Sequence, residues 1–143
     1  MTSQKGSLME SIARPVPART ELDQHWYDAL SEGRLIYQRT DHNAWLPPRS
    51  EDPATLSPDW EWFEATGSAR LVSWVTYHRA YHPFWEDKLP YQVGVVELDE
   101  GPRMIAPLLL GGVVPAIDLP LTVDIGFDGG QWIPFFVPAS GVR

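Results

Sequence analysis

The first apolar pattern in the chain has the period of an α-helix and lies between Thr20 and Gly33. Thr20 can cap this helix, and Gly33 suits its end. Glu21 and Asp23 place negative charge in the first turn. Four apolar side chains fall on one face, namely Leu22, Trp26, Ala29 and Leu30. Because so short an amphipathic helix needs a surface to lie against, it packs either on its own domain or on another subunit.

After the helix, the alternation of apolar and polar residues has the period of β-strands. Strands are expected over residues 35–39, 59–67, 70–78, 91–99, 103–111, 121–127 and 131–138. The turns "EGP" and "DGG" each join two later strands into a hairpin, where glycine can adopt a positive φ. Five strands after residue 67 predict a small closed barrel, because closure removes the exposed edges of a small sheet. Pro107 and Pro134 interrupt strand segments and should lie at edges or bulges.

The composition limits the classes of function that the chain can serve. Its 143 residues suit one domain, and the absence of cysteine excludes disulfides and is typical of a reducing cytoplasm. No apolar run has the length of a membrane span, and residues 1–19 lack the apolar core of a secretory signal. We therefore expect a cytoplasmic protein without a membrane partner, in which residues 1–19 form a flexible arm.

The charge argues against a nucleic-acid partner. The formal net charge is −8, and the 11 Lys and Arg residues are scattered rather than clustered. Binding to a phosphate backbone requires a basic surface, so aromatic side chains alone do not predict a nucleic-acid interface.

Two runs of residues carry a resemblance to a known family. They are "PPR" followed by "SPDWEW" between residues 47 and 62, and "PYQVGVVELDEGPRM" over 90–104. In this order, they resemble the acyl-CoA-associated OB-fold family, long labelled domain of unknown function 35, over residues 20–138. The resemblance implies a mainly β fold. An N-terminal helix and a small ribbon-like lobe would span residues 20–66, and a five-stranded OB-fold barrel would span residues 67–143.

Members of that family usually carry a rubredoxin-like zinc ribbon ahead of the barrel, with two Cys-x-x-Cys knuckles. The matching positions in this sequence are Thr40, Asn43, Asp52 and Thr55. Structural zinc requires Cys or His ligands, whereas this set offers one carboxylate and three neutral side chains. The departure from the family pattern predicts a lobe that holds no zinc.

Without a metal, the ribbon lobe needs another means of closure. A buried aromatic ring removes about 150–250 Å² from water, which contributes several kcal/mol. The stretch is rich in large side chains, namely Trp45, Leu46, Pro47, Pro48, Trp60, Trp62 and Phe63. We expect these, with turns capped by Asp41, Asn43 and Asp52, to close the lobe. The alternative is a different cation held by His25, Asp41, His42 and Asp52.

The stretch "HRAYHPFW" contains the best candidates for chemistry or ligand binding. His78 and His82 lie four residues apart, but no acidic residue lies between them as in zinc peptidases. They are either ordinary loop histidines or a general acid and base at a thioester carbonyl. The candidate ligand-side loop comprises His78, Tyr81, His82, Phe84 and Trp85. The sequence contains no nucleophile elbow and no phosphate-binding loop.

The resemblance implies a non-catalytic accessory subunit of an acyl-CoA-processing complex. Its partner would be a thiolase-like enzyme, a sterol-carrier-type thiolase or aldolase, or a hot-dog hydratase, with acyl-CoA as a possible ligand and no other cofactor. The candidate partner-facing or lobe-packing residues are Trp26, Tyr27, Trp45, Trp60 and Trp62. The alternative is a stand-alone enzyme on an acyl thioester that uses His78 or His82.

Overall fold

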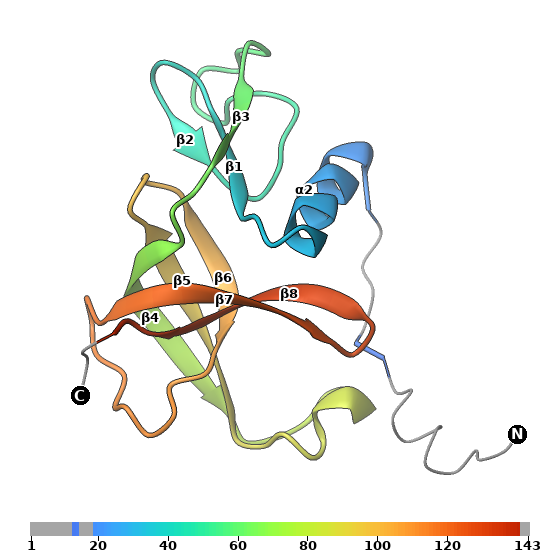
Figure 1. The fold of residues 1–143 in the computed structure, drawn as a ribbon, viewed down its shortest axis with the longest axis vertical. Helices are drawn as coiled ribbons and strands as arrows, with labels where there is room; N and C mark the ends of the chain where they lie inside the picture. The colour runs from blue at the N-terminus through green and yellow to red at the C-terminus, as the bar shows by residue number, and fades with distance from the viewer. Residues whose placement is uncertain (1–12, 15–18, 141–143) are drawn as a thin grey trace, which may run out of the picture.

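The computed structural model describes residues 13–14 and 19–140. The predicted flexible arm lies outside these residues except at 13, 14 and 19. The described chain forms a helix, a three-stranded ribbon sheet and a closed five-stranded barrel, which confirms the predicted mainly β fold (Figure 1). None of its helices is both long and apolar enough to cross a membrane.

The helix α2 (Glu21–Ser31) begins with the predicted cap at Thr20. The Thr20 hydroxyl accepts a hydrogen bond from the Asp23 N–H, and the Asp23 carboxylate accepts one from the Thr20 N–H, which forms a capping box. Gly33 follows the helix with a φ of 81°. Ala29 and Leu30 are buried, and α2 contacts both the ribbon and the barrel. The helix therefore packs on its own domain.

The ribbon sheet is antiparallel, with strand order β2-β1-β3. Its strands are β1 (Ile36–Arg39), β2 (Ala44–Trp45) and β3 (Glu61–Glu64). Strand β2 was not among the predicted strands, because a strand of two residues is too short to show an alternating pattern. The Trp26 indole N–H on α2 donates to the Ile36 carbonyl at 2.9 Å and so fixes the helix against this sheet.

The barrel has the strand order β4-β5-β6-β8-β7. Its strands are β4 (Ser68–Tyr77), β5 (Tyr91–Leu98), β6 (Arg103–Leu108), β7 (Pro120–Asp128) and β8 (Gln131–Pro138), and the short helix η1 (Pro83–Trp85) lies between β4 and β5. Among the described strands, β6 and β8 form the only parallel pairing, in which Leu108 lies opposite Phe136. Pro107 and Pro134 lie in these two strands.

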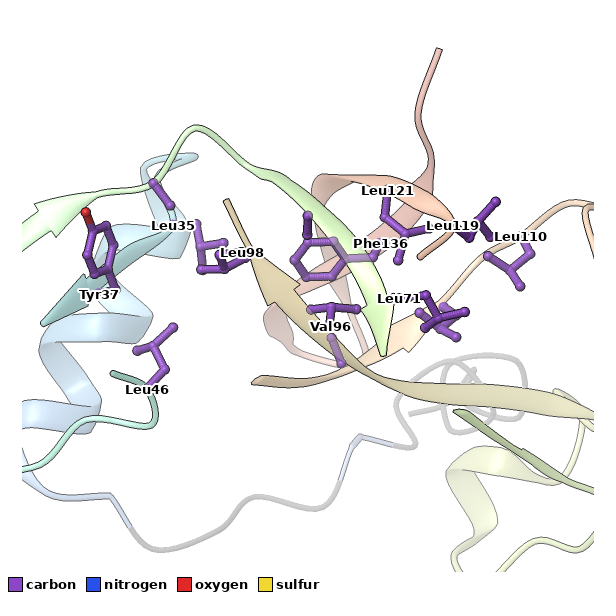
Figure 2. Close-up of a cluster of buried hydrophobic side chains, with 14 of the residues drawn as sticks. Leu35, Tyr37, Leu46, Leu71, Val96, Leu98, Leu110, Leu119, Leu121 and Phe136 are labelled. Atoms are coloured by element: carbon purple, nitrogen blue, oxygen red, sulfur yellow. The ribbon is translucent and has the colours of Figure 1, made fainter. Parts of the chain in front are cut away.

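One apolar core runs through the barrel into the ribbon lobe. Phe136, Leu71 and Val96 are fully buried in the barrel, and Tyr37 and Leu46 of the ribbon belong to the same cluster (Figure 2). The two lobes are also joined at their boundary, where the Thr66 N–H donates to the Glu100 carboxylate at 2.9 Å. Ribbon and barrel therefore share one hydrophobic interior.

Gly94 of β5 tests the packing of the barrel interior. A Cβ atom there would lie 2.8 Å from Leu108 Cδ1 and 2.9 Å from Leu71 Cδ1. We expect Gly94→Ala to lower the free energy of unfolding by about 1–3 kcal/mol, because the core must shift to admit one methyl group. Urea unfolding followed by circular dichroism measures the change.

Gly126→Ala in β7 is the matched control. A Cβ atom at Gly126 would lie 3.5 Å from the Phe135 ring, which is an ordinary contact. If Gly126→Ala destabilises the protein as much as Gly94→Ala, the tight interior around Leu71 and Leu108 is not the cause.

Candidate functional site

The ribbon lobe is organised around the carboxylate of Asp52, which is 0% exposed. Its Oδ2 accepts a hydrogen bond from the Thr40 hydroxyl at 2.8 Å. Its Oδ1 accepts bonds from Asn43 Nδ2 at 3.1 Å, the Ala54 N–H at 2.8 Å and the Thr55 N–H at 3.3 Å. The four positions that match the family's knuckle ligands, Thr40, Asn43, Asp52 and Thr55, thus meet at one carboxylate.

This arrangement does not fit zinc. The Asp52 oxygens are already occupied by four donors, and the other three positions provide no thiolate or imidazole. In the described part of the chain, no group of three or more His, Cys, Asp or Glu side chains is placed to hold a metal ion. His25, one member of the alternative cation set, instead packs its ring 5.0 Å from that of Trp62.

A second buried polar side chain fixes the proline-rich segment of the lobe. Gln38 is fully buried on β1, donates from Nε2 to the Arg49 carbonyl at 2.6 Å and accepts from the Arg49 N–H at 2.7 Å. The Gln38 amide thus satisfies both backbone groups of Arg49, as a paired strand would. Sequence reasoning missed Gln38, because a glutamine within a strand carries no sign of burial.

The predicted partner-facing aromatic residues mostly pack within the protein. Trp45 is buried, whereas Trp26, Tyr27, Trp60 and Trp62 are half-buried. The Trp60 and Trp62 rings meet edge to face at 5.5 Å, and the Trp60 indole N–H donates to the Ser50 carbonyl. These contacts place Trp60 and Trp62 in the closure of the lobe, together with the Asp52 and Gln38 networks.

An apolar groove of about 580 Å³ lies where helix, ribbon and barrel meet. Trp26 and Tyr27 of α2 line it on one side, and Met104 and Ile105 of β6 line it on another. The remaining lining residues are Asp23, Leu46, Pro47, Pro48, Val95 and Arg103. Ile105 is 73% exposed, although it is a large apolar side chain. Sequence reasoning missed Ile105, because the alternation of residues along β6 does not show whether another element covers the outer face of this strand.

Only part of the predicted ligand-side loop, between β4 and β5, lies at a cavity. His82 caps η1, with its Nδ1 accepting from the Phe84 N–H at 3.1 Å, and Phe84 is buried. His78 and Tyr81 are exposed, and no hydrogen bond or ring contact joins His78 to His82 among the described residues. Trp85 faces a second cavity at this end of the barrel. The loop therefore does not join the two histidines by a direct hydrogen bond or ring contact.

Glu97 of the β5–β6 hairpin belongs to an ion-pair network. Glu97 accepts hydrogen bonds from Arg103 at 2.9 Å and from Arg70 at 3.0 Å. These bonds, first that from Arg103, hold the pKa of Glu97 below its ordinary value. Arg70 also pairs with Asp118. Glu97 is therefore ionised by structural partners and is not poised as a proton donor.

Comparisons with known proteins place these features in a family. A sequence profile of the C-terminal OB-fold domain of ChsH2 matches residues 62–125. A solved structure described as an Ltp2-ChsH2(DUF35) aldolase contains a similar chain, with 32% sequence identity and a TM-score of 0.73, over 86% of this chain and 98% of that chain. No curated protein sequence matches.

A protein of unknown function from the DUF35 family of Sulfolobus solfataricus has a similar structure. It is 13% identical with a TM-score of 0.56, over 81% of this chain and 84% of that chain. This likeness concerns the fold alone.

Thr40→Val removes the hydroxyl that donates to Asp52 and that accepts hydrogen bonds from the His42 and Asn43 N–H groups. Its loss leaves a buried carboxylate oxygen without its side-chain donor, so we expect a decrease of about 1–3 kcal/mol in the free energy of unfolding, measured by urea denaturation. Thr55→Val is the matched control, because Thr55 binds Asp52 through its backbone N–H. Equal losses in both variants would contradict the assigned role of the Thr40 hydroxyl.

The pKa of Asp52 predicts how the lobe responds to acid. Burial raises this pKa, but the bonds from Ala54, Asn43, Thr40 and Thr55 outweigh burial and hold it well below the ordinary value of 3.8. Because the folded state favours the ionised form, Asp52 contributes fully to stability at pH values above its pKa in the unfolded chain. This contribution is lost as the pH falls toward the pKa of Asp52 in the folded protein.

We expect the difference in urea midpoint between the unmodified protein and Asp52→Asn to be largest near neutral pH and to shrink below about pH 4. Asp59→Asn, at an exposed carboxylate of the same lobe, is the control. A difference that stays constant from neutral pH to about pH 3 would contradict the role of the Asp52 charge.

Proposed function

Since the chain belongs to the DUF35 family of OB-fold proteins, we propose that it is a non-catalytic accessory subunit of an acyl-CoA-processing complex. Its partner in this proposal is a thiolase-like aldolase. The observation that carries the proposal is the 32% identity to a chain of the Ltp2-ChsH2(DUF35) aldolase, which this chain covers over 98% of its length.

The groove between α2, the ribbon and β6 is the proposed docking surface for the partner. Its walls are apolar and aromatic, as in the central part of protein interfaces, and Asp23 and Arg103 contribute opposite charges to its lining. Trp26 and Tyr27 line the groove from positions already fixed by packing. A preorganised wall of this kind lowers the entropic cost of association.

The acyl-CoA substrate class and the position of the barrel beside the acyl-CoA channel are further parts of the proposal. They follow from the family resemblance, and a hot-dog hydratase is the alternative partner. The geometry of His78 and His82 gives no support to a stand-alone enzyme, because His82 is engaged in capping η1 and His78 is exposed.

Ile105→Glu tests the docking surface. A carboxylate at position 105 would lose its water against the apolar walls of the groove when the partner docks, so we expect the affinity for the cognate thiolase-like aldolase to fall at least about tenfold. Co-purification and calorimetric titration measure the loss. Val114→Glu is the matched control, because Val114 is 78% exposed on the loop after β6 and does not line the groove.

The accessory role itself is tested by activity. The aldolase should cleave its acyl-CoA substrate faster in the presence of the unmodified chain, of His78→Ala and of His82→Ala. The chain alone should show no turnover. Turnover by the isolated chain that disappears in either histidine variant would support the enzyme instead, and complex formation with only a hydratase would replace the proposed partner.

A further inference from the structure

The end of the barrel that lies away from the ribbon lobe contains a second cavity of about 690 Å³. Figure 1 shows the loops over residues 78–90 and 109–119 at this end. Leu108, Leu110 and Phe135 contribute apolar walls to the cavity, and Trp85 and Tyr91 contribute aromatic walls. The partner groove is lined by a different set of residues, so the cavity is a separate feature.

The aromatic wall is preorganised by ring stacking. The Trp85 and Tyr91 rings stack with centroids 4.4 Å apart and planes 20° apart. Tyr91 also stacks on Tyr77 at 4.9 Å. Because the three rings support one another, the wall keeps its orientation without a ligand. Rings stacked face to face cover each other's faces, so the wall offers ring edges to an apolar group, and edge-to-face contact is a favoured arrangement for aromatic rings.

Two cationic side chains line the same cavity. Arg14 is anchored by an ion pair with Asp128 at 3.0 Å and lies over the rings of Phe84 and Trp85, at 4.7 and 4.9 Å from their centroids. Lys88 Nζ lies 4.0 Å from the centroid of the Phe84 ring and donates to the Phe84 carbonyl at 3.1 Å. Asp128 also lines the cavity and offsets the charge of Arg14. Lys88 pairs at 3.3 Å with Asp87, which does not line the cavity. The lining residues themselves therefore carry one net positive charge.

The Arg14 side chain has an unused hydrogen-bond donor. It is only 10% exposed, and its Nε–H has no hydrogen-bond partner among the described residues. A buried guanidinium N–H without an acceptor is costly, and an acceptor atom supplied by a ligand would remove this cost. A charged acceptor would also gain from the neighbouring Lys88 ammonium.

From these features, we infer that the cavity binds a small amphipathic anion, with an apolar body against the ring edges of Trp85 and Tyr91 and an anionic group near Arg14 and Lys88. Sequence reasoning had proposed a ligand-side role for Trp85, but not for Arg14, Lys88 or Tyr91. The inference concerns the isolated chain and does not depend on the partner subunit.

The probe that tests it is 2-naphthoate, compared with 2-naphthalenemethanol, a neutral molecule of similar size and shape. Titrations of the isolated full chain, followed by calorimetry or by NMR, give both dissociation constants. We expect saturable binding of one 2-naphthoate per chain, about tenfold or more tighter than the alcohol, because charge-assisted hydrogen bonds favour the carboxylate.

Variants separate the anionic from the apolar contribution. Lys88→Gln should bring the two dissociation constants closer together, and Arg14→Gln should do the same if circular dichroism shows that it remains folded. Trp85→Leu should weaken both probes. Arg79→Gln is the matched control, since Arg79 is exposed in the same loop and does not line the cavity.

Three results would overturn the inference. They are the absence of saturable binding, equal affinity for the two probes, and a loss of selectivity in Arg79→Gln as large as in Lys88→Gln. The first two would show that the cavity has no preference for an anion, and the third would show that the preference arises from general charge and not from the lining residues.

Discussion

The compactness of the ribbon lobe depends on the buried carboxylate of Asp52. It draws together the Thr40 hydroxyl, the Asn43 amide and two backbone N–H groups from the next turn. Where a structural metal would be held by four anionic or neutral ligands, here one anion is held by four donors, so the sign of the central charge is reversed. Desolvation of such a charge is tolerated because both oxygens have partners. The lobe in turn contributes Tyr37 and Leu46 to the core that it shares with the barrel.

That shared core explains why helix, ribbon and barrel can present one continuous surface. Trp26 is tied to β1 by its indole N–H, while Leu30 at the end of the same helix is buried in the common cluster. The groove between α2, the ribbon and β6 is therefore built on elements that share one interior. Thr66 and Glu100 add a direct hydrogen bond across the boundary of the lobes. A partner that docks here meets a surface formed before binding.

Much of the fold follows from local sequence signals, whereas the sites depend on long-range contacts. The strands of the barrel were predicted to within a few residues because one face of each is buried, and Gly101 and Gly129 adopt the positive φ expected of their turns. The family resemblance identified Thr40 and Asp52 as matching positions of the two knuckles, but it did not indicate the burial of the carboxylate. Arg14 lies in a proline-rich segment without periodicity, and its position depends on Asp128, which is 114 residues away. No local pattern encodes such a contact.

The polar groups of this chain indicate whether it contributes binding or chemistry to a complex. The carboxylates of Asp52 and Glu97, whose pKa values are both lowered, are engaged by donors that hold the fold together, and His82 caps η1. A general acid or base needs a pKa near the working pH, which these two carboxylates do not have. By contrast, two hollows with largely apolar walls lie at the surface, the groove beside α2 and the cavity beside Trp85. A subunit that contributes shape and binding surface to a partner's chemistry accounts for both features, because recognition requires preorganised apolar walls and needs no reacting group.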